Sequence, residues 1–121
     1  MKVKAPKLTA NSLTKQALRV FDLCGYECWR QNNNAVWDAK KKVFRVNSVR
    51  VGQSDIIGYH RKTGQFLAAE IKAGNDKLSA AQVVFLTGVV KAGGVGITVR
   101  SIEDLEIFLQ LHNGFKSAKA K

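Results

Sequence analysis

The chain has 121 residues, and its 20 Lys and Arg against 9 Asp and Glu give a formal net charge of +11 at pH 7. Hydrophobic residues make up 45% of the sequence, enough to fill one core without disulfides or metal, which argues against disorder and against a disulfide-stapled mini-protein. Apolar runs such as residues 83–86 are far shorter than the roughly 20 residues of a membrane helix. We expect one soluble, cytoplasmic domain over residues 11–112, with flexible basic tails at 1–10 and 113–121.

The first third of the chain predicts a helix, a strand and an irregular segment. Residues 12–24 carry apolar side chains at helical spacing, and Gly25 follows where a helix end favours glycine. A strand is expected over residues 26–30. Residues 31–52 contain three consecutive asparagines and three consecutive lysines around a short candidate strand at 43–46. We expect that segment to be a solvated, basic loop.

The middle of the chain predicts a β-hairpin. Two strand-like segments, residues 54–60 and 66–72, are separated by five residues that include Gly64. Glycine adopts the positive φ that a tight reversal requires. The two segments are therefore expected to pair with each other.

The last third predicts helix, strand and helix. Ser79 stands three residues before Gln82, the spacing of a capping box that opens a helix. The apolar face of that helix is expected to hold Val83, Leu86, Val89 and Val90. Glycines 93–94 end it, residues 95–100 form a short apolar strand, and Ser101 caps the final helix. The inward residues of the final helix are expected to be Ile102, Leu105, Phe108 and Leu109. Together these elements predict an α/β fold, a mixed central sheet flanked by helices.

The two cysteines, Cys24 and Cys28, are four residues apart, a spacing that fits either buried thiols or a metal pair. Structural zinc prefers four nitrogen or sulfur ligands. The further candidates, His60 and His112, do not have ligand-pair spacing. We therefore expect buried thiols and no zinc.

The net charge of +11 favours a polyanionic partner. Basic residues that neutralise a phosphate backbone release its condensed counterions, which drives binding. The alternative is that the charge serves solubility alone. Six of the lysines lie in the two expected tails: Lys2, Lys4, Lys7, Lys116, Lys119 and Lys121. Nucleic acid is the first partner to consider.

The residues that carry chemistry are concentrated in the predicted hairpin. Glu70 and Lys72 are two apart, so in a strand they point to the same face. Asp55 joins them if it pairs with Glu70, which needs a reversal centred between Lys62 and Thr63. A three-residue loop with a glycine bulge would shift the register by one and separate the acids. The sequence leaves that register open.

Two interpretations of this cluster remain open, because carboxylates among apolar neighbours need a partner. In the first, Lys72 forms an ion pair with Asp55 or Glu70 and the cluster is structural. In the second, the two carboxylates form an oxygen-rich site for a hard divalent cation such as Mg²⁺. Lys72 would then hold the attacking water and balance charge on a phosphate.

The order of these motifs resembles the split Asp…(Asp/Glu)-x-Lys signature of the PD-(D/E)xK nuclease superfamily, and within it the VRR-NUC group of phage and bacterial nucleases. The motifs are Gly-Gln-Ser-Asp-Ile-Ile-Gly at residues 52–58 and Ala-Glu-Ile-Lys at residues 69–72. Further matches stand at residues 29–32, 77–82, 92–94 and 99–105. The resemblance spans residues 13–109, and the combined order and spacing are more specific than any one motif.

The resemblance implies an α-β-β-β-α-β, restriction-endonuclease-like core plus a C-terminal helix. It implies Mg²⁺ or Mn²⁺ held by Asp55, Glu70 and the backbone carbonyl of Ile71, with Lys72 as the catalytic lysine. Gln82 would also face the site as a fourth catalytic residue, beside or instead of its capping role.

The resemblance also implies DNA contacts from Arg30, Asn32 and Lys77, although a strand-end arginine is commonly a solvated charge. One departure from the family pattern is the first helix, where relatives carry a Glu and this chain has no acid at residues 10–17. The polar residues that could stand in are Asn11, Ser12 and Gln16. A second metal would then be held more weakly.

The expected function is Mg²⁺-dependent endonucleolytic cleavage of DNA in a bacterial or phage-infected host cell. We expect selectivity for branched DNA such as four-way Holliday junctions, and a homodimer whose contact could include Val36, Trp37 and Val49. One alternative is a noncatalytic basic nucleic-acid-binding module with a degenerate nuclease fold, which would bind DNA without cleaving it. Another is a protein-interaction module with a basic surface.

Overall fold

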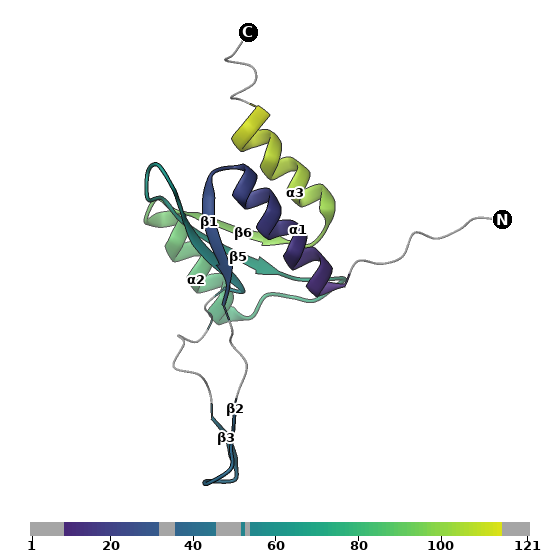
Figure 1. The fold of residues 1–121 in the computed structure, drawn as a ribbon, viewed down its shortest axis with the longest axis vertical. Coiled ribbons are helices and arrows are strands. Elements are labelled where there is room, and N and C mark those ends of the chain that lie inside the picture. The colour runs from purple at the N-terminus through teal and green to yellow at the C-terminus, as the bar shows by residue number, and fades with distance from the viewer. Residues whose placement is uncertain (1–8, 32–35, 46–51, 53, 115–121) are drawn as a thin grey trace, which may run out of the picture.

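The computed structural model describes residues 9–31, 36–45, 52 and 54–114 of the chain (Figure 1). The helices are α1 (Ala10–Leu23), α2 (Ala80–Lys91) and α3 (Ile102–Leu109), followed by a short π-helical segment, η1 (Gln110–Gly114). The strands are β1 (Tyr26–Arg30), β2 (Val36–Asp38), β3 (Val43–Arg45), β4 (Ile56–His60), β5 (Phe66–Ile71) and β6 (Val95–Val99). The expected tails fall largely outside the described residues.

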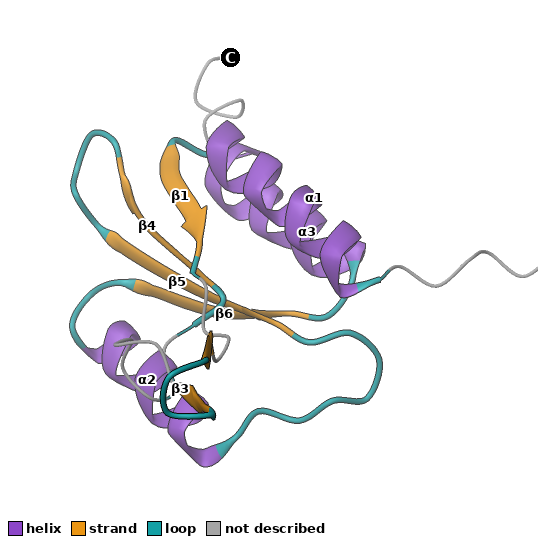
Figure 2. Ribbon diagram, turned by 60° about the horizontal axis from the view of Figure 1, so that its bottom comes forward, coloured by secondary structure: helices purple, strands orange, loops and turns teal. Residues whose placement is uncertain are grey.

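The main sheet is mixed and has the strand order β1-β4-β5-β6. Strands β1, β4 and β5 pair antiparallel in succession, and β6 lies parallel to β5. Helices α1 and α3 lie on one face of this sheet, and α2 lies on the other face over β5 and β6 (Figure 2). The protein is therefore a single small α/β domain with a mixed sheet between helices, as the sequence predicts.

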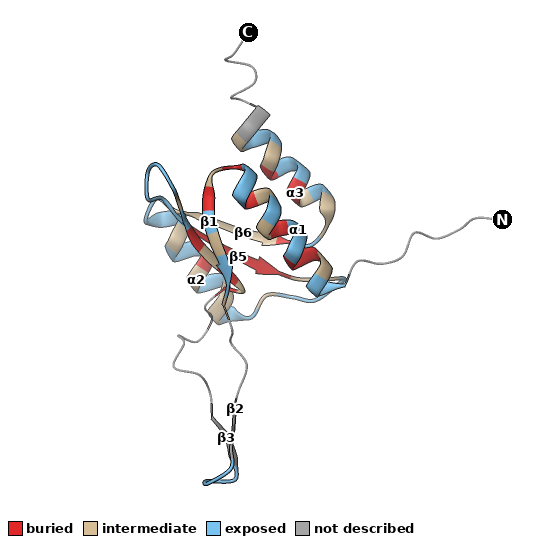
Figure 3. Ribbon diagram, viewed as in Figure 1, coloured by how far each residue is buried: buried red, intermediate tan, exposed pale blue. Residues whose placement is uncertain are grey.

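The hydrophobic core lies between the sheet and helices α1 and α3 (Figure 3). Phe21 of α1 and Phe108 of α3 meet edge to face, with ring centroids 5.0 Å apart. Tyr26 of β1 and Ile56 of β4 are buried against them. Each such side chain contributes about 1.5–3 kcal/mol when it is removed from water. This face of the sheet therefore holds the hydrophobic core, and helix α2 covers β5 and β6 on the opposite face.

Several predicted elements are confirmed with small shifts. Helix α1 begins two residues earlier than predicted, because Thr9 Oγ1 accepts a hydrogen bond from the backbone of Ser12 and caps the helix. Gly25 follows its end with φ of +93°, and β1 has the predicted bounds. In α3, Leu105 and Phe108 are buried and the other two predicted inward residues pack against the core.

The segment predicted as a basic loop contains a small hairpin of its own. Strand β2 pairs antiparallel with β3, and their two-stranded sheet is separate from the main sheet. Strand β3 lies within the predicted candidate, but β2 was not predicted, because three residues are too few to display a clear alternation. Lys40, Lys41 and Lys42 form the exposed turn between the strands. Val49 and the side chains of Val36 and Trp37 lie outside the described residues.

The predicted apolar face of α2 is only partly correct. Leu86 is buried and Val89 is partly buried, but Val83 and Val90 are exposed. Because α2 is apolar on nearly every side, its sequence pattern does not single out the side that meets the sheet. The neighbouring glycine of β6, Gly96, lets the α2 backbone approach closely at Leu86.

Both cysteines are free thiols, with Cys24 buried and Cys28 partly buried. Burial is the main cause that raises the pKa of Cys28 to about 12. The described residues contain no group of three or more His, Cys, Asp or Glu side chains arranged to hold a metal ion. None of the helices in the described ranges is both long and apolar enough to cross a membrane.

Two glycines offer a matched test of this packing. A Cβ on Gly58 of β4 would stand 2.1 Å from the Glu27 carbonyl oxygen and 2.7 Å from the Cys28 Cα, so strand β1 would have to move. We expect Gly58→Ala to lower the free energy of unfolding by about 3 kcal/mol. Gly88→Ala in α2 meets nothing within 4 Å and should raise it by about 0.5–1 kcal/mol. Denaturant titration measures both, and equal effects would contradict the close approach of β1 and β4.

Candidate active site

The register of the β4–β5 hairpin brings the two predicted acids together. Ile56 pairs with Ala69 and Tyr59 with Phe66, so the reversal is centred between residues 62 and 63. The same register, continued by one residue, places Asp55 opposite Glu70 on the face of the sheet that carries α2. The register condition that the sequence left open is therefore met, and a one-residue shift is excluded.

Asp55 lies just before β4 and is held by the strands on both sides. Its carboxylate Oδ2 accepts a hydrogen bond of 2.9 Å from the Ile71 backbone N–H. Its own carbonyl oxygen accepts one of 2.6 Å from the backbone N–H of Gln31. Because the N–H and C=O of one strand residue point to the same side, the Ile71 carbonyl is directed toward Asp55 as well. A carboxylate and a carbonyl oxygen thus lie at the same sheet edge.

Glu70 is a buried carboxyl group with one oxygen that has no partner. Glu70 is only 2% exposed to solvent. Oε1 accepts a hydrogen bond of 2.9 Å from Gln82 Nε2, whereas Oε2 is fully buried and has no hydrogen-bond partner among the described residues. Burial of a carboxylate oxygen without a hydrogen-bond partner is unfavourable in free energy, so Oε2 is an unsatisfied polar atom of the site.

The pKa of Glu70 reflects this environment. Its pKa is raised to about 8, mainly by burial and in addition by the neighbouring Asp55 carboxylate, and the Lys72 charge partly offsets these effects. Without a cation, this environment therefore favours the protonated form of Glu70.

Gln82 caps helix α2 and also contacts Glu70. Its side-chain oxygen accepts a 2.8 Å hydrogen bond from the Ser79 backbone N–H, and its own backbone N–H donates to Ser79 Oγ. This is the predicted capping box of α2. The remaining side-chain group, Nε2, donates to Glu70. One residue thus starts the helix and fixes one oxygen of the carboxylate pair.

Lys72 follows β5 and shares the face of Glu70. Its backbone N–H donates to the Val99 carbonyl at 3.0 Å, which continues the alternation of β5 by one residue. Among the described residues, no carboxylate lies within the 4.0 Å of an ion pair with its amine. The ion pair offered by the structural interpretation is therefore not formed in this part of the chain.

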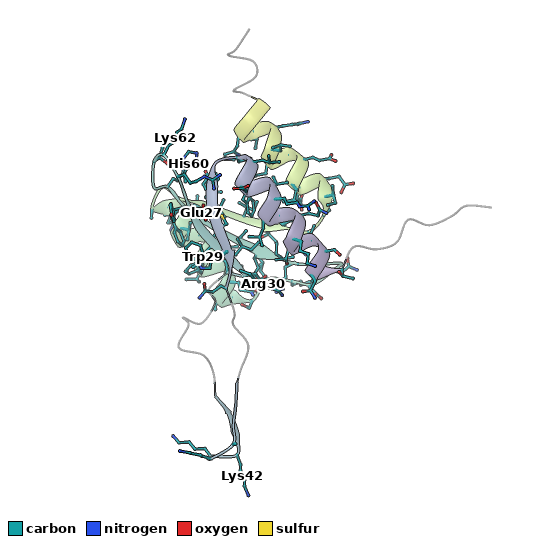
Figure 4. The ribbon with its side chains drawn as sticks, in the orientation of Figure 1. Glu27, Trp29, Arg30, Lys42, His60 and Lys62 are labelled. Atoms are coloured by element: carbon teal, nitrogen blue, oxygen red, sulfur yellow. The ribbon has the colours of Figure 1, made fainter. Side chains whose placement is uncertain are left out.

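The predicted DNA contacts are not brought together with the acids. Arg30 pairs with Ile56, whose side chain lies in the core, so Arg30 points to the α1 face and not to the face of Asp55. Its Nη1 donates to Asn11 Oδ1 at 3.1 Å (Figure 4). Lys77 is exposed in the loop before α2. Asn32 lies outside the described residues.

The first helix supplies no further acid to the site. Helix α1 has no acidic residue in its first turn. Of the proposed substitutes, Asn11 is engaged by Arg30 and Gln16 is exposed on α1. The described donors for a cation are therefore the two carboxylates and the Ile71 carbonyl.

Three residues that sequence reasoning missed share the face of Asp55: Trp29, Gln31 and Tyr59. Trp29 Nε1 donates to Gln31 Oε1 at 3.2 Å, and the Trp29 and Tyr59 rings meet edge to face with centroids 6.5 Å apart. Because side chains alternate along a strand, Trp29 and Gln31 point to the face opposite to that of Arg30. This alternation is visible in the sequence, but it identifies the face of Asp55 only when the pairing of β1 with β4 is known.

Comparison of the chain with protein-family models and with curated proteins found no match.

Proposed function

We propose that this protein is a divalent-metal-dependent phosphodiesterase that cleaves DNA internally. The observation that carries the proposal is the juxtaposition of the partly buried Asp55 with the buried Glu70, in which one oxygen of Glu70 has no partner, with Lys72 two residues further along. The resemblance of the sequence to the PD-(D/E)xK signature supports it. So does an α/β domain in which the acids come from neighbouring strands beneath the start of α2, an arrangement compatible with a restriction-endonuclease-like core.

The residues present fit Mg²⁺ or Mn²⁺. The ion would be held by the carboxylates of Asp55 and Glu70 and by the Ile71 carbonyl, all hard oxygen donors of the kind that such cations prefer. A cation would take the place of the proton that burial favours on Glu70 and would give Glu70 Oε2 a partner. When bound, it would lower the pKa of a water molecule and stabilise negative charge on phosphate oxygens.

The remaining residues of the site position these groups. The Ile71 N–H holds Asp55 Oδ2, and Gln82 holds Glu70 Oε1, so these two contacts leave the second oxygen of each acid for a cation. The Lys72 ammonium lies on the same face, where it can hold a water molecule against the phosphate and balance the charge that develops during hydrolysis. In-line attack by that water would break the phosphodiester bond.

The partner is DNA in this proposal because of the charge of the chain. A net charge of +11 attracts phosphates, and the exposed lysine turn of the β2–β3 hairpin, Lys40 to Lys42, adds a local basic surface. Lys77 adds another positive charge before α2. Sequence-independent attraction of this kind supplies affinity without reading bases.

A noncatalytic DNA-binding module is the second candidate, and the first helix favours it. The first turn of α1 carries no acid, so one carboxylate of the family pattern is absent. In this alternative Asp55 and Glu70 bind no cation and only maintain the fold. The two candidates differ in a single observable, Mg²⁺-dependent cleavage.

Selectivity for branched DNA and a homodimeric state belong to the same proposal. Two-fold pairing would place two sites across one branched substrate, so that paired cuts fall on opposing strands.

Cleavage assays on a four-way junction, a flap and a linear duplex of equal length test this proposal. We expect cleavage that requires Mg²⁺ or Mn²⁺, is faster on the branched substrates, and comes from a particle of twice the 13.3 kDa chain mass in light scattering. Cleavage in chelator would overturn the metal dependence. A monomer that cuts linear duplex as fast as the junction would overturn the selectivity, and tight binding without cleavage would favour the noncatalytic module.

A further inference from the structure

An exposed row of aromatic side chains crosses the same face of the sheet as the carboxylate pair. Trp29 of β1, Tyr59 of β4 and Phe66 of β5 are 45%, 44% and 40% exposed. Tyr59 pairs directly with Phe66, and the Trp29 and Tyr59 rings are in edge-to-face contact. Helix α2 packs over β5 and β6, and none of the described helices covers β1 and β4 on this side (Figure 2).

This row lies next to the candidate active site. Trp29 is two residues from Gln31, whose backbone donates to Asp55, and the Trp29 indole N–H is itself bonded to the Gln31 side chain. With a rise of roughly 3.4 Å per strand residue, Trp29 and Tyr59 lie about 7 and 13 Å along the strands from the Asp55 position. The indole N–H is thus occupied, whereas part of the Trp29 surface stays open to solvent.

The charged side chains at one end of the row are paired with one another. Glu27 lies on β1 beside Trp29 (Figure 4), and Arg61 forms an ion pair with it at 3.1 Å. Arg61 also pairs with Asp22 at 2.9 Å. Lys62 is exposed beside them in the β4–β5 turn. A phosphate backbone can therefore approach this edge of a chain whose overall charge is +11.

We propose that Trp29, Tyr59 and Phe66 form a platform on which unpaired DNA bases stack beside the site of cleavage. This inference rests on the proposed function, because it takes DNA as the substrate. Every base has a π-face, so stacking on aromatic side chains binds single strands with little regard to sequence. Bases in a continuous duplex are already stacked on one another, whereas flaps, gaps and opened junctions present unpaired ones. The platform would therefore favour DNA with an unpaired segment next to the scissile phosphate.

Binding measured in chelator tests the platform without any need for catalysis. The probes are a labelled single-stranded oligonucleotide, an abasic oligonucleotide of the same length and charge, and a duplex. We expect Trp29→Ala to weaken binding of the base-containing single strand by about tenfold, with Trp29→Phe retaining most of the affinity. Binding of the abasic strand and of the duplex should stay within about twofold, because phosphate contacts dominate there.

Two further variants keep the test decisive. Tyr59→Leu retains an apolar side chain without an aromatic face, and it should also weaken single-strand binding several-fold if Trp29→Ala fails to fold. Leu23→Ala is the control, because Leu23 is 66% exposed at the end of α1, away from the row, and should change nothing.

The outcomes separate this inference from the proposed function. Equal losses on the base-containing and abasic strands, or no loss on either, would overturn the platform. Conversion of a wild-type dimer to a monomer by Trp29→Ala would overturn it too, since the row would then be a self-association surface. Base-dependent binding by a protein that never cleaves DNA would overturn the phosphodiesterase and retain the platform.

Discussion

Replacement of Glu70 by Gln, or of Asp55 by Asn, is expected to lower Mg²⁺-dependent DNA cleavage by about a thousandfold or more. Each change keeps the shape of the side chain and removes one of the two anionic oxygen donors. Lys72→Met should have a comparable effect, because it removes a cation on the face of Glu70 that can balance charge on the phosphate. Initial rates with a junction substrate and Mg²⁺ in excess measure all three.

DNA affinity separates a chemical defect from a binding defect in these variants. Affinity should stay within about threefold of wild type, since binding depends on the wider positive surface. Glu106→Gln is the matched control, because Glu106 is an exposed carboxylate of α3 far from the pair, and it should cleave at the wild-type rate. Undiminished cleavage by both Glu70→Gln and Asp55→Asn would show that the acids are not the active site.

The stability of the protein without metal should fall as pH rises from about 5 to 8. The pKa of Glu70 is about 8 in the folded state and close to the ordinary 4.5 when unfolded. Between these values the folded chain keeps a proton that the unfolded chain has lost, so increasing pH favours unfolding. The expected loss is on the order of 3 kcal/mol, and it should level off above the folded-state pKa.

Glu70→Gln should remove this pH dependence, because an amide does not titrate and can still pair with Gln82. At pH 8 in chelator, the variant is therefore expected to be more stable than wild type, although it is inactive. Mg²⁺ should restore stability to wild type at pH 8 and leave the variant unchanged. Denaturant titrations at pH 5, 6.5 and 8 measure both effects. If the free energy of unfolding depends on pH in the same way for wild type and Glu70→Gln, the raised pKa of Glu70 is contradicted.

The parts of the site that were predictable depend on local sequence. The capping box at Ser79 and the hairpin around Gly64 are determined by residues close together in the chain, and both are present in the structure. The pairing of Asp55 with Glu70 follows from the length of that hairpin once its turn is known. The hairpin register is therefore the single unknown that decides whether the two acids share one face of the sheet.

The parts that were not predictable depend on contacts between elements. The orientation of Arg30 follows from the pairing of β1 with β4, and the buried side of α2 follows from where that helix crosses β5 and β6. The unpartnered oxygen of Glu70 arises because Gln82, from another element, satisfies only the other oxygen. The periodicity of the sequence does not predict contacts between separate elements. The unpartnered oxygen of Glu70 could therefore be identified only from the fold.

The double use of Gln82 restricts which amino acid this position accepts. A capping box works equally well with Glu at its third position. Here Glu would keep the cap but place a third carboxylate against Glu70 and remove the group that donates to it. Asparagine is one methylene too short to repeat both contacts. Among related sequences that retain both acids, an invariant glutamine at this helix start would therefore be a more selective marker of the site than the Glu-x-Lys motif itself.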